Sequence, residues 1–113
     1  MNGYQARLDL WYGRVWELQG LWIDPDGRIV RHKGREANLT HREASLLGFL
    51  LAHPHRFFSA EQILSRAWAD SALSPEEVRN YVKRVRGILS ELEVPVDLVN
   101  RPRRGYSLIF RDG

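Results

Sequence analysis

The hydrophobic pattern of the chain changes its period near residue 40. Before that point, apolar residues occur in short runs that are rich in Val, Leu, Trp and Tyr and are interrupted by turn residues. After it, Leu, Ile and Val recur every three or four residues over three stretches, as they do on one side of an α-helix. The pattern therefore predicts a sheet followed by three helices, with two further short strands near the C-terminus.

Residues 1–39 are predicted to form an antiparallel sheet of about four strands. The strongest turn signal is Asp24-Pro25-Asp26-Gly27, and Lys33-Gly34 marks a second turn. The segments with strand character are residues 6–11, 13–18, 20–23, 28–31 and 36–39.

Local cap signals mark where each predicted helix begins. Thr40-His41-Arg42-Glu43 and Ser59-Ala60-Glu61-Gln62 are capping boxes, in which two side chains satisfy free amides at the helix start. The first helix should end near His53-Pro54, because the residue before proline avoids the α region. The second should run to about residue 69. Ser74-Pro75 then begins the third helix, which is expected to span residues 75–92.

The third helix is amphipathic, and its polar side is cationic. One side carries aliphatic residues at helical spacing, namely Val78, Val82, Val85, Leu89 and Leu92. The opposite side carries Asn80, Lys83, Arg84 and Gly87, with Arg79 and Arg86 on the flanks. A helix with one buried stripe and a free cationic face suits the major groove of DNA, so Asn80, Lys83 and Arg84 are the predicted base contacts. Gly87 weakens the helix by roughly 1 kcal/mol relative to Ala, and it either permits closer approach to DNA or is neutral.

A basic hairpin is predicted after the third helix. Residues 96–99 and 106–110 have strand character, and Asn100-Arg101-Pro102-Arg103-Arg104-Gly105 joins them. Helices two and three form a helix-turn-helix, and the hairpin makes it winged, so the fold class is α+β. In such units the last helix enters the major groove while other elements hold the backbone. Arg101, Arg103 and Arg104 are therefore expected on phosphates or in a minor groove.

Length and charge fit this arrangement. The 113 residues suit a single domain, residues 1–113, divided into a sheet (1–39), a helical core (40–92) and a wing (93–111). Residues 78–111 carry eight Lys/Arg and three acids, a net charge of +5, whereas the whole chain carries +3. This concentration predicts a polyanionic partner such as double-stranded DNA. Charge alone also fits an ordinary solvated surface.

Several functional classes are not expected. The chain has no Cys, so disulfides, Cys-based zinc sites and thiol nucleophiles are excluded. No apolar run approaches the roughly 20 residues of a membrane span, and no signal-peptide layout begins the chain, so a cytoplasmic location is expected. His53 and His55 lack a third ligand at metal-binding spacing. With no nucleophile beside a base and no Gly-rich phosphate loop, we expect neither an enzyme nor a cofactor.

Taken together, the residues resemble the OmpR/PhoB-type winged-helix DNA-binding domain over about residues 15–110. The landmarks that fall at the family's spacing are Leu39-Thr40…Glu43, Leu46-Leu47, His53-Pro54, Trp68, Val82…Arg84-Val85-Arg86 and Gly105-Tyr106. The wing Pro102-Arg103-Arg104-Gly105-Tyr106 is more similar to the ToxR/CadC-type branch than to response regulators. No receiver domain accompanies these landmarks, so the chain is either an excised effector domain or a stand-alone protein.

The resemblance implies transcriptional regulation through direct-repeat DNA half-sites, with two copies pairing on DNA. Asn80 and Arg84 fall on positions that face bases in the family. Positions that usually touch phosphates are occupied by Trp68, Tyr81, Lys83 and Arg86. The loop Asp70, Ser71, Ala72 and Leu73 matches a segment that contacts RNA polymerase.

The sequence leaves some roles open. Arg86 suits an intramolecular partner as well as a phosphate, and Trp68 suits the core as well as a phosphate contact. Pro102 stands where the family has an Arg that probes the minor groove, so Arg101 or Arg103 would have to supply that contact. His55 replaces an expected Gly, and His tolerates the left-handed conformation better than most residues.

The alternative function is a winged-helix module that binds another protein without reading DNA, since fold alone does not settle function. Trp11, Trp16 and Trp22 are expected to pack within the sheet. An exposed pair among them would favour such a protein interface.

Overall fold

The N-terminal sheet forms as four antiparallel strands in chain order. The structure is a computed structural model that describes residues 16–18, 21–24, 27–68 and 73–111. The strands are β1 (Trp16–Leu18), β2 (Leu21–Asp24), β3 (Ile29–His32) and β4 (Arg35–Asn38). The predicted strand over residues 6–11 and the first part of the segment 13–18 lie outside the described residues.

Left-handed residues occur where the sequence predicted tight turns. Lys33 and Gly34 have φ angles of 50° and 80°, the consecutive positive values that a two-residue hairpin between β3 and β4 requires. His55 also has a positive φ of 67°, so the histidine adopts the conformation for which a glycine was expected. In the Asp24–Gly27 turn, the Gly27 amide donates to Asp24 Oδ1 at 3.0 Å, and Pro25 and Asp26 lie outside the described residues.

The two predicted capping boxes are present at the starts of α2 (His41–Ala52) and α3 (Ala60–Ile63). Thr40 Oγ1 accepts from the Glu43 amide at 3.2 Å, and Glu43 Oε1 accepts from the Thr40 amide at 2.8 Å. Ser59 and Gln62 make the equivalent pair of bonds at 3.1 and 2.8 Å. These bonds satisfy amides that have no partner within the helix.

The second helix differs from the regular α-helix that its spacing predicted. After Ile63 the chain winds into a π-helical turn, Leu64–Trp68 (η1). Such wider turns occur as short insertions in α-helices. Hydrophobic spacing does not signal this turn, because the apolar residues of the segment remain on one side under either winding.

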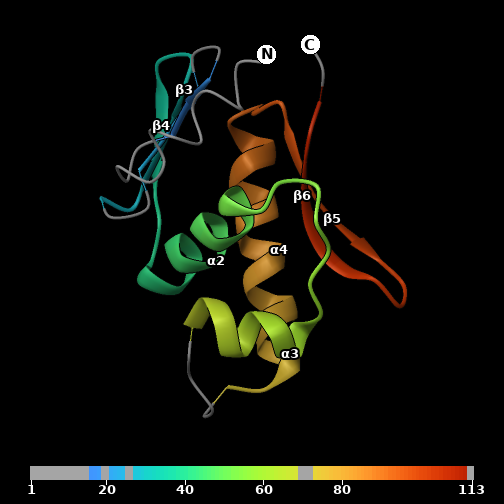
Figure 1. Cartoon of the computed structure of the whole chain (residues 1–113). Coiled ribbons are helices and arrows are strands. Elements are labelled where there is room, and N and C mark those ends of the chain that lie inside the picture. Colours follow the sequence, from blue (N-terminus) through green and yellow to red (C-terminus); the bar gives the residue numbers. More distant parts are fainter. Residues whose placement is uncertain (1–15, 19–20, 25–26, 69–72, 112–113) are drawn as a thin grey trace.

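The third helix, α4 (Pro75–Glu91), begins and ends as predicted, with Leu92 as its cap. The Ser74 amide donates to Glu77 Oε1 at 3.4 Å, and Pro75 occupies the first helical position. Val78, Val82, Val85 and Leu89 are buried, and the helix contacts α2, α3 and β5. Figure 1 shows α4 in orange, with the N-terminal sheet on one side of it and the C-terminal hairpin on the other.

The C-terminal hairpin consists of β5 (Val96–Arg101) and β6 (Gly105–Phe110), both longer than predicted. Phe58 extends it, because its amide donates to Tyr106 O at 2.9 Å and its carbonyl accepts from the Tyr106 amide at 2.8 Å. The sequence did not predict this third segment. Gly105 permits the approach, since a Cβ there would lie 2.1 Å from Phe58 O.

A buried histidine ties the N-terminal sheet to the helices. His32 on β3 is only 2% exposed, and its Nδ1 donates to the Leu92 carbonyl at the end of α4 at 2.7 Å. Ile23 and Val30 from the same sheet are fully buried within the core that α2, α4 and the hairpin also supply. The sheet therefore packs into the same core as the helices.

Gly105→Ala should destabilise the fold more than Gly34→Ala. Both residues have positive φ, at 103° and 80°, but a Cβ on Gly34 would meet nothing within 4 Å. Gly34→Ala should therefore cost only the dihedral strain of about 1–2 kcal/mol, whereas Gly105→Ala also forces Phe58 O away. Urea unfolding of both variants measures the difference, and equal losses would contradict the close contact with Phe58.

Stability should decline in acid through His53. Burial lowers the pKa of this side chain, and the charges of Arg56 and Arg66 lower it further. Its ring lies against Phe49 and Phe58, with centroids 5.2 and 5.4 Å away. Because the folded state disfavours protonation, the free energy of unfolding should fall as the pH drops below about 6.5.

His53→Gln removes this titration and should reduce the loss of stability between about pH 7.5 and about pH 5.5. The exposed His41, changed to Gln, provides the control. The assignment to His53 is wrong if urea unfolding shows the same pH dependence in His53→Gln as in the unmodified chain.

Candidate nucleic-acid interface

The outward side of α4 carries the three side chains predicted to face bases. Asn80, Lys83 and Arg84 are all exposed, whereas Val78, Val82 and Val85 on the opposite side are buried. The three polar residues fall within two turns of one helix, so their side chains can reach a common surface. The structure therefore brings the predicted base contacts together.

A chain of aromatic contacts supports Arg84. Its guanidinium carbon lies 5.0 Å from the ring centroid of Tyr81, within the range of a cation–π contact. Tyr81 meets Trp68 edge-on at 5.3 Å. Trp68 is in turn fixed by its indole N–H, which donates to the Arg42 carbonyl at 2.9 Å. This arrangement limits the freedom of Arg84 before any ligand binds, which lowers the entropic cost of a contact.

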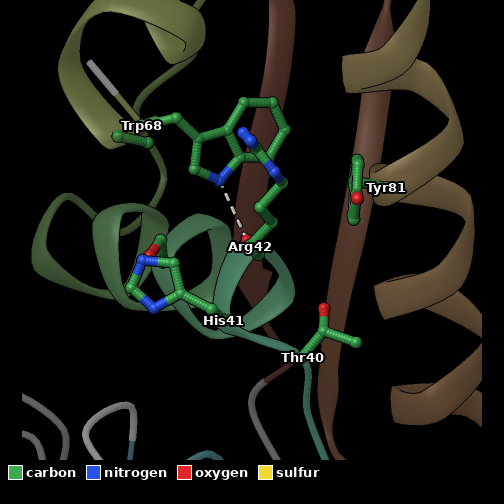
Figure 2. Close-up of a pocket in the computed structure, with 7 residues that line it drawn as sticks. Thr40, His41, Arg42, Trp68 and Tyr81 are labelled. Atoms are coloured by element: carbon green, nitrogen blue, oxygen red, sulfur yellow. Dashed lines mark hydrogen bonds between the residues drawn. The ribbon is translucent and has the colours of Figure 1, made fainter. Parts of the chain in front are cut away.

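A cleft of about 400 Å³ lies beside these aromatic rings. Figure 2 shows Trp68, Arg42 and Tyr81, which reach it from η1, α2 and α4 respectively. The remaining lining residues are Thr40, His41, Ser45 and Ala67. The indole N–H of Trp68, which was predicted to suit either the core or a phosphate, is used within the protein.

The two flanking arginines of α4 differ in their surroundings. Arg86 Nε donates to the Leu98 carbonyl on β5 at 2.9 Å, so this side chain links the helix to the hairpin. The intramolecular alternative for Arg86 is therefore present. Arg79 is exposed on the same helix, near its N-terminal end.

The three wing arginines lie at the tip of the hairpin. Arg101 is the last residue of β5, and Arg103 occupies the turn with a φ of 67°. The guanidinium of Arg104 lies over the ring of Phe57 at 4.3 Å, and all three arginines are exposed. The stacking on Phe57 thus restrains Arg104 within the tip.

The roles of Phe57 and Phe58 in this region were not predicted from the sequence. Phe57 supports Arg104, and Phe58 pairs with β6 through the main chain. The only local signal was a pair of aromatic residues between Pro54 and the cap Ser59. That pattern does not identify its partner, because the contact spans almost 50 residues of sequence.

The predicted polymerase-contact loop cannot be placed as a whole. Asp70, Ser71 and Ala72 lie outside the described residues, and Leu73 is half-buried just before α4. Within the described part of the chain, no group of three or more His, Cys, Asp or Glu side chains is arranged to hold a metal ion. None of the described helices is both long enough and apolar enough to cross a membrane.

Comparisons with known proteins agree with this architecture. Residues 34–108 match the family described as "Transcriptional regulatory protein, C terminal". The phosphate regulon transcriptional regulatory protein PhoB of Klebsiella pneumoniae is 32% identical over 76 residues, which cover 66% of this chain and 33% of PhoB. The chain thus spans about a third of the length of this curated relative.

Solved structures share the fold. The DNA-binding domain of E. coli CadC superposes with a TM-score of 0.74 at 23% identity, covering 83% of this chain and 90% of that domain. The DNA-binding domain of the response regulator AdeR, solved in complex with an intercistronic region, gives 0.69 at 24% identity and covers 83% and 97%. Because the family match covers well over half of the chain, the chain belongs to the OmpR/PhoB-type family of transcriptional regulatory protein C-terminal domains.

Proposed function

We propose that this chain binds a specific sequence of double-stranded DNA and thereby regulates transcription, with α4 in the major groove and the β5–β6 tip on the backbone. The family is one of transcriptional regulators rather than of enzymes. The observation that carries the proposal is the exposed trio Asn80, Lys83 and Arg84 on the side of α4 opposite its buried stripe. The relative AdeR binds DNA through a domain of the same fold.

The chemistry of the trio matches base edges in the major groove. An Arg donates two parallel hydrogen bonds to O6 and N7 of guanine, and an Asn pairs similarly with N6 and N7 of adenine. We assign these roles to Arg84 and Asn80. Lys83 carries a compact charge one residue before Arg84, so it can reach either a guanine or a neighbouring phosphate.

The wing supplies sequence-independent affinity in this proposal. Arg101 and Arg103 are exposed at its tip, where they can neutralise phosphates or enter a minor groove. Arg104 and Arg79 are assigned to the backbone as well. Tyr81 is half-buried beside Arg84, and we assign its hydroxyl to a phosphate.

Two residues predicted to contact the DNA backbone receive a different role. Trp68 donates a hydrogen bond to the carbonyl of Arg42, and Arg86 donates one to the carbonyl of Leu98. We therefore assign Trp68 chiefly to supporting Tyr81 and Arg84, and Arg86 chiefly to joining α4 to the wing. The indole N–H is the only donor of Trp68, so it leaves none for a phosphate, whereas Arg86 keeps its other guanidinium N–H groups for such a contact.

The proposed assembly on DNA rests on the resemblance to the family and not on contacts within this chain. We propose direct-repeat half-sites, occupied in the cytoplasm by two copies that pair on the duplex. Contact with RNA polymerase through the loop of Asp70, Ser71, Ala72 and Leu73 remains a prediction. A selection from random duplexes would report the half-site and its spacing, and hence the geometry of the pair.

The described part of the N-terminal sheet gives little support to the alternative function, a protein-binding module. Trp22 is half-buried and lies 6.0 Å from the guanidinium of Arg31, which is paired with Glu36 at 3.2 Å. The side chains of Trp11 and Trp16 lie outside the described part of the chain, and neither of the described tryptophans, Trp22 and Trp68, is exposed. Passage of the chain through heparin and random-duplex columns at low ionic strength would favour the alternative.

Arg84→Ala and Arg103→Ala should affect DNA binding in different ways. Loss of Arg84 should remove about 1–3 kcal/mol of discrimination at one base pair, because a bidentate contact to guanine disappears. Loss of Arg103 should weaken binding to all duplexes about equally and reduce the salt slope by about 1. Binding titrations with the selected duplex and its single-base variants, over a range of salt, measure both effects.

An unchanged base preference in Arg84→Ala would show that α4 does not read the sequence through this residue. The same titrations on Asn80→Ala locate the second base contact.

Arg86→Ala should mainly lower the stability of the fold, whereas Arg79→Ala should mainly lower affinity for DNA. Removing Arg86 breaks a hydrogen bond between a charged group and the Leu98 carbonyl, so unfolding should become easier by about 1–2 kcal/mol. Removing the exposed Arg79 should change stability by no more than about 0.5 kcal/mol while lowering affinity for DNA. Urea unfolding with parallel binding measurements compares them, and the assignment fails if Arg79→Ala proves the less stable variant.

A further inference from the structure

Gly87 lies in the middle of α4, where neither the local conformation nor the packing requires a glycine. The residue is exposed, and a Cβ built on it would meet nothing within 4 Å. Among the described glycines, positive φ angles occur at Gly34 and Gly105 but not at Gly87. Since glycine disfavours a helix interior, its presence here weakens the helix without helping the fold.

The position of Gly87 on the helix is central to the proposed DNA-facing surface. At about 100° per residue, Gly87 points within about 20° of Asn80, and between the directions of Lys83 and Arg84. Each of those neighbours presents a long or polar side chain, whereas Gly87 presents only backbone. The surface that carries the proposed base contacts therefore has a recess one turn beyond Arg84.

The recess lies where the helix should meet the edge of the groove. Gly87 is about 10.5 Å along the axis from Asn80, and the major groove is about 12 Å wide. One turn beyond Gly87, the exposed Glu91 points in almost the same direction as Asn80. A carboxylate there repels phosphates, so close contact with DNA must end before Glu91.

We propose that the sugar–phosphate wall of the major groove packs directly against the backbone of α4 at Gly87. The missing side chain then determines how deeply Asn80 and Arg84 reach toward the base edges. This inference rests on the proposed function, since it concerns the depth of a helix in a DNA groove. Gly87 is a positioning residue in this scheme, because it carries no group that identifies a base.

The test uses Gly87→Ala and Gly87→Leu in the full chain. Both new residues favour helix more than glycine does, so each variant should unfold at a higher urea concentration than the unmodified chain. Affinity for the selected duplex should nevertheless fall by about tenfold in Gly87→Ala, and further in Gly87→Leu, because the larger side chain holds the helix further from the bases. Affinity for a random duplex should change by only about twofold, since long-range charge attraction tolerates a small displacement.

Ser90 provides the matched control position. It is exposed on the same helix and points about 60° away from Gly87, and it directly precedes Glu91, where close contact with DNA should already have ended. Ser90→Ala and Ser90→Leu should leave affinity for the selected duplex within about twofold of the unmodified chain.

The possible failures are distinguishable. If Gly87→Ala and Gly87→Leu bind the selected duplex as tightly as the unmodified chain, the close-approach inference is wrong while the proposed function stands. Equal losses at Ser90 and Gly87 would also overturn it, because the effect would not be specific to the recess. If the unmodified chain enriches no sequence from a random pool, the proposed function fails and this inference fails with it.

Discussion

Burial of one side of α4 determines where each proposed DNA contact on that helix points. Val78, Val82, Val85 and Leu89 are removed from water by α2, α3 and β5, so the helix cannot rotate about its axis without exposing them. A helix held in this way presents its opposite side in a fixed direction. The exposure of Arg84 and its neighbours is therefore a consequence of the core, and the contact with Tyr81 restricts that arginine further.

The wing depends on the same core through its main chain. An isolated two-stranded hairpin is marginal in water, but Phe58 adds two main-chain hydrogen bonds to Tyr106 of β6. Gly105 allows the two backbones to approach, and Arg86 joins α4 to the Leu98 carbonyl of β5. The proposed groove-reading helix and the basic tip are thus parts of one packed unit, which suits simultaneous contact with a groove and its adjacent backbone.

Features set by neighbouring residues could be predicted from the sequence. The capping box at Thr40, the start of α4 at Ser74 and the two faces of α4 depend on residues a few positions apart. Contacts between distant segments could not be predicted in the same way. His32 bonds to the carbonyl of residue 92, and Trp68 to that of residue 42, because packing brings those atoms together. The candidate DNA-facing residues could thus be identified from the helical periodicity. The partners of Trp68 and Arg86 became known only from the three-dimensional structure.

Mapping the DNA-contacting surface is the most direct test that α4 and the wing tip form it. An NMR titration of the isotopically labelled chain with its selected duplex would follow the backbone amides residue by residue. We expect the largest shifts at Asn80, Lys83, Arg84 and Gly87 and at Arg101, Arg103 and Arg104, with small shifts across β2–β4. Shifts concentrated around Trp22 and Arg31 on the sheet, with the outward side of α4 unaffected, would contradict it.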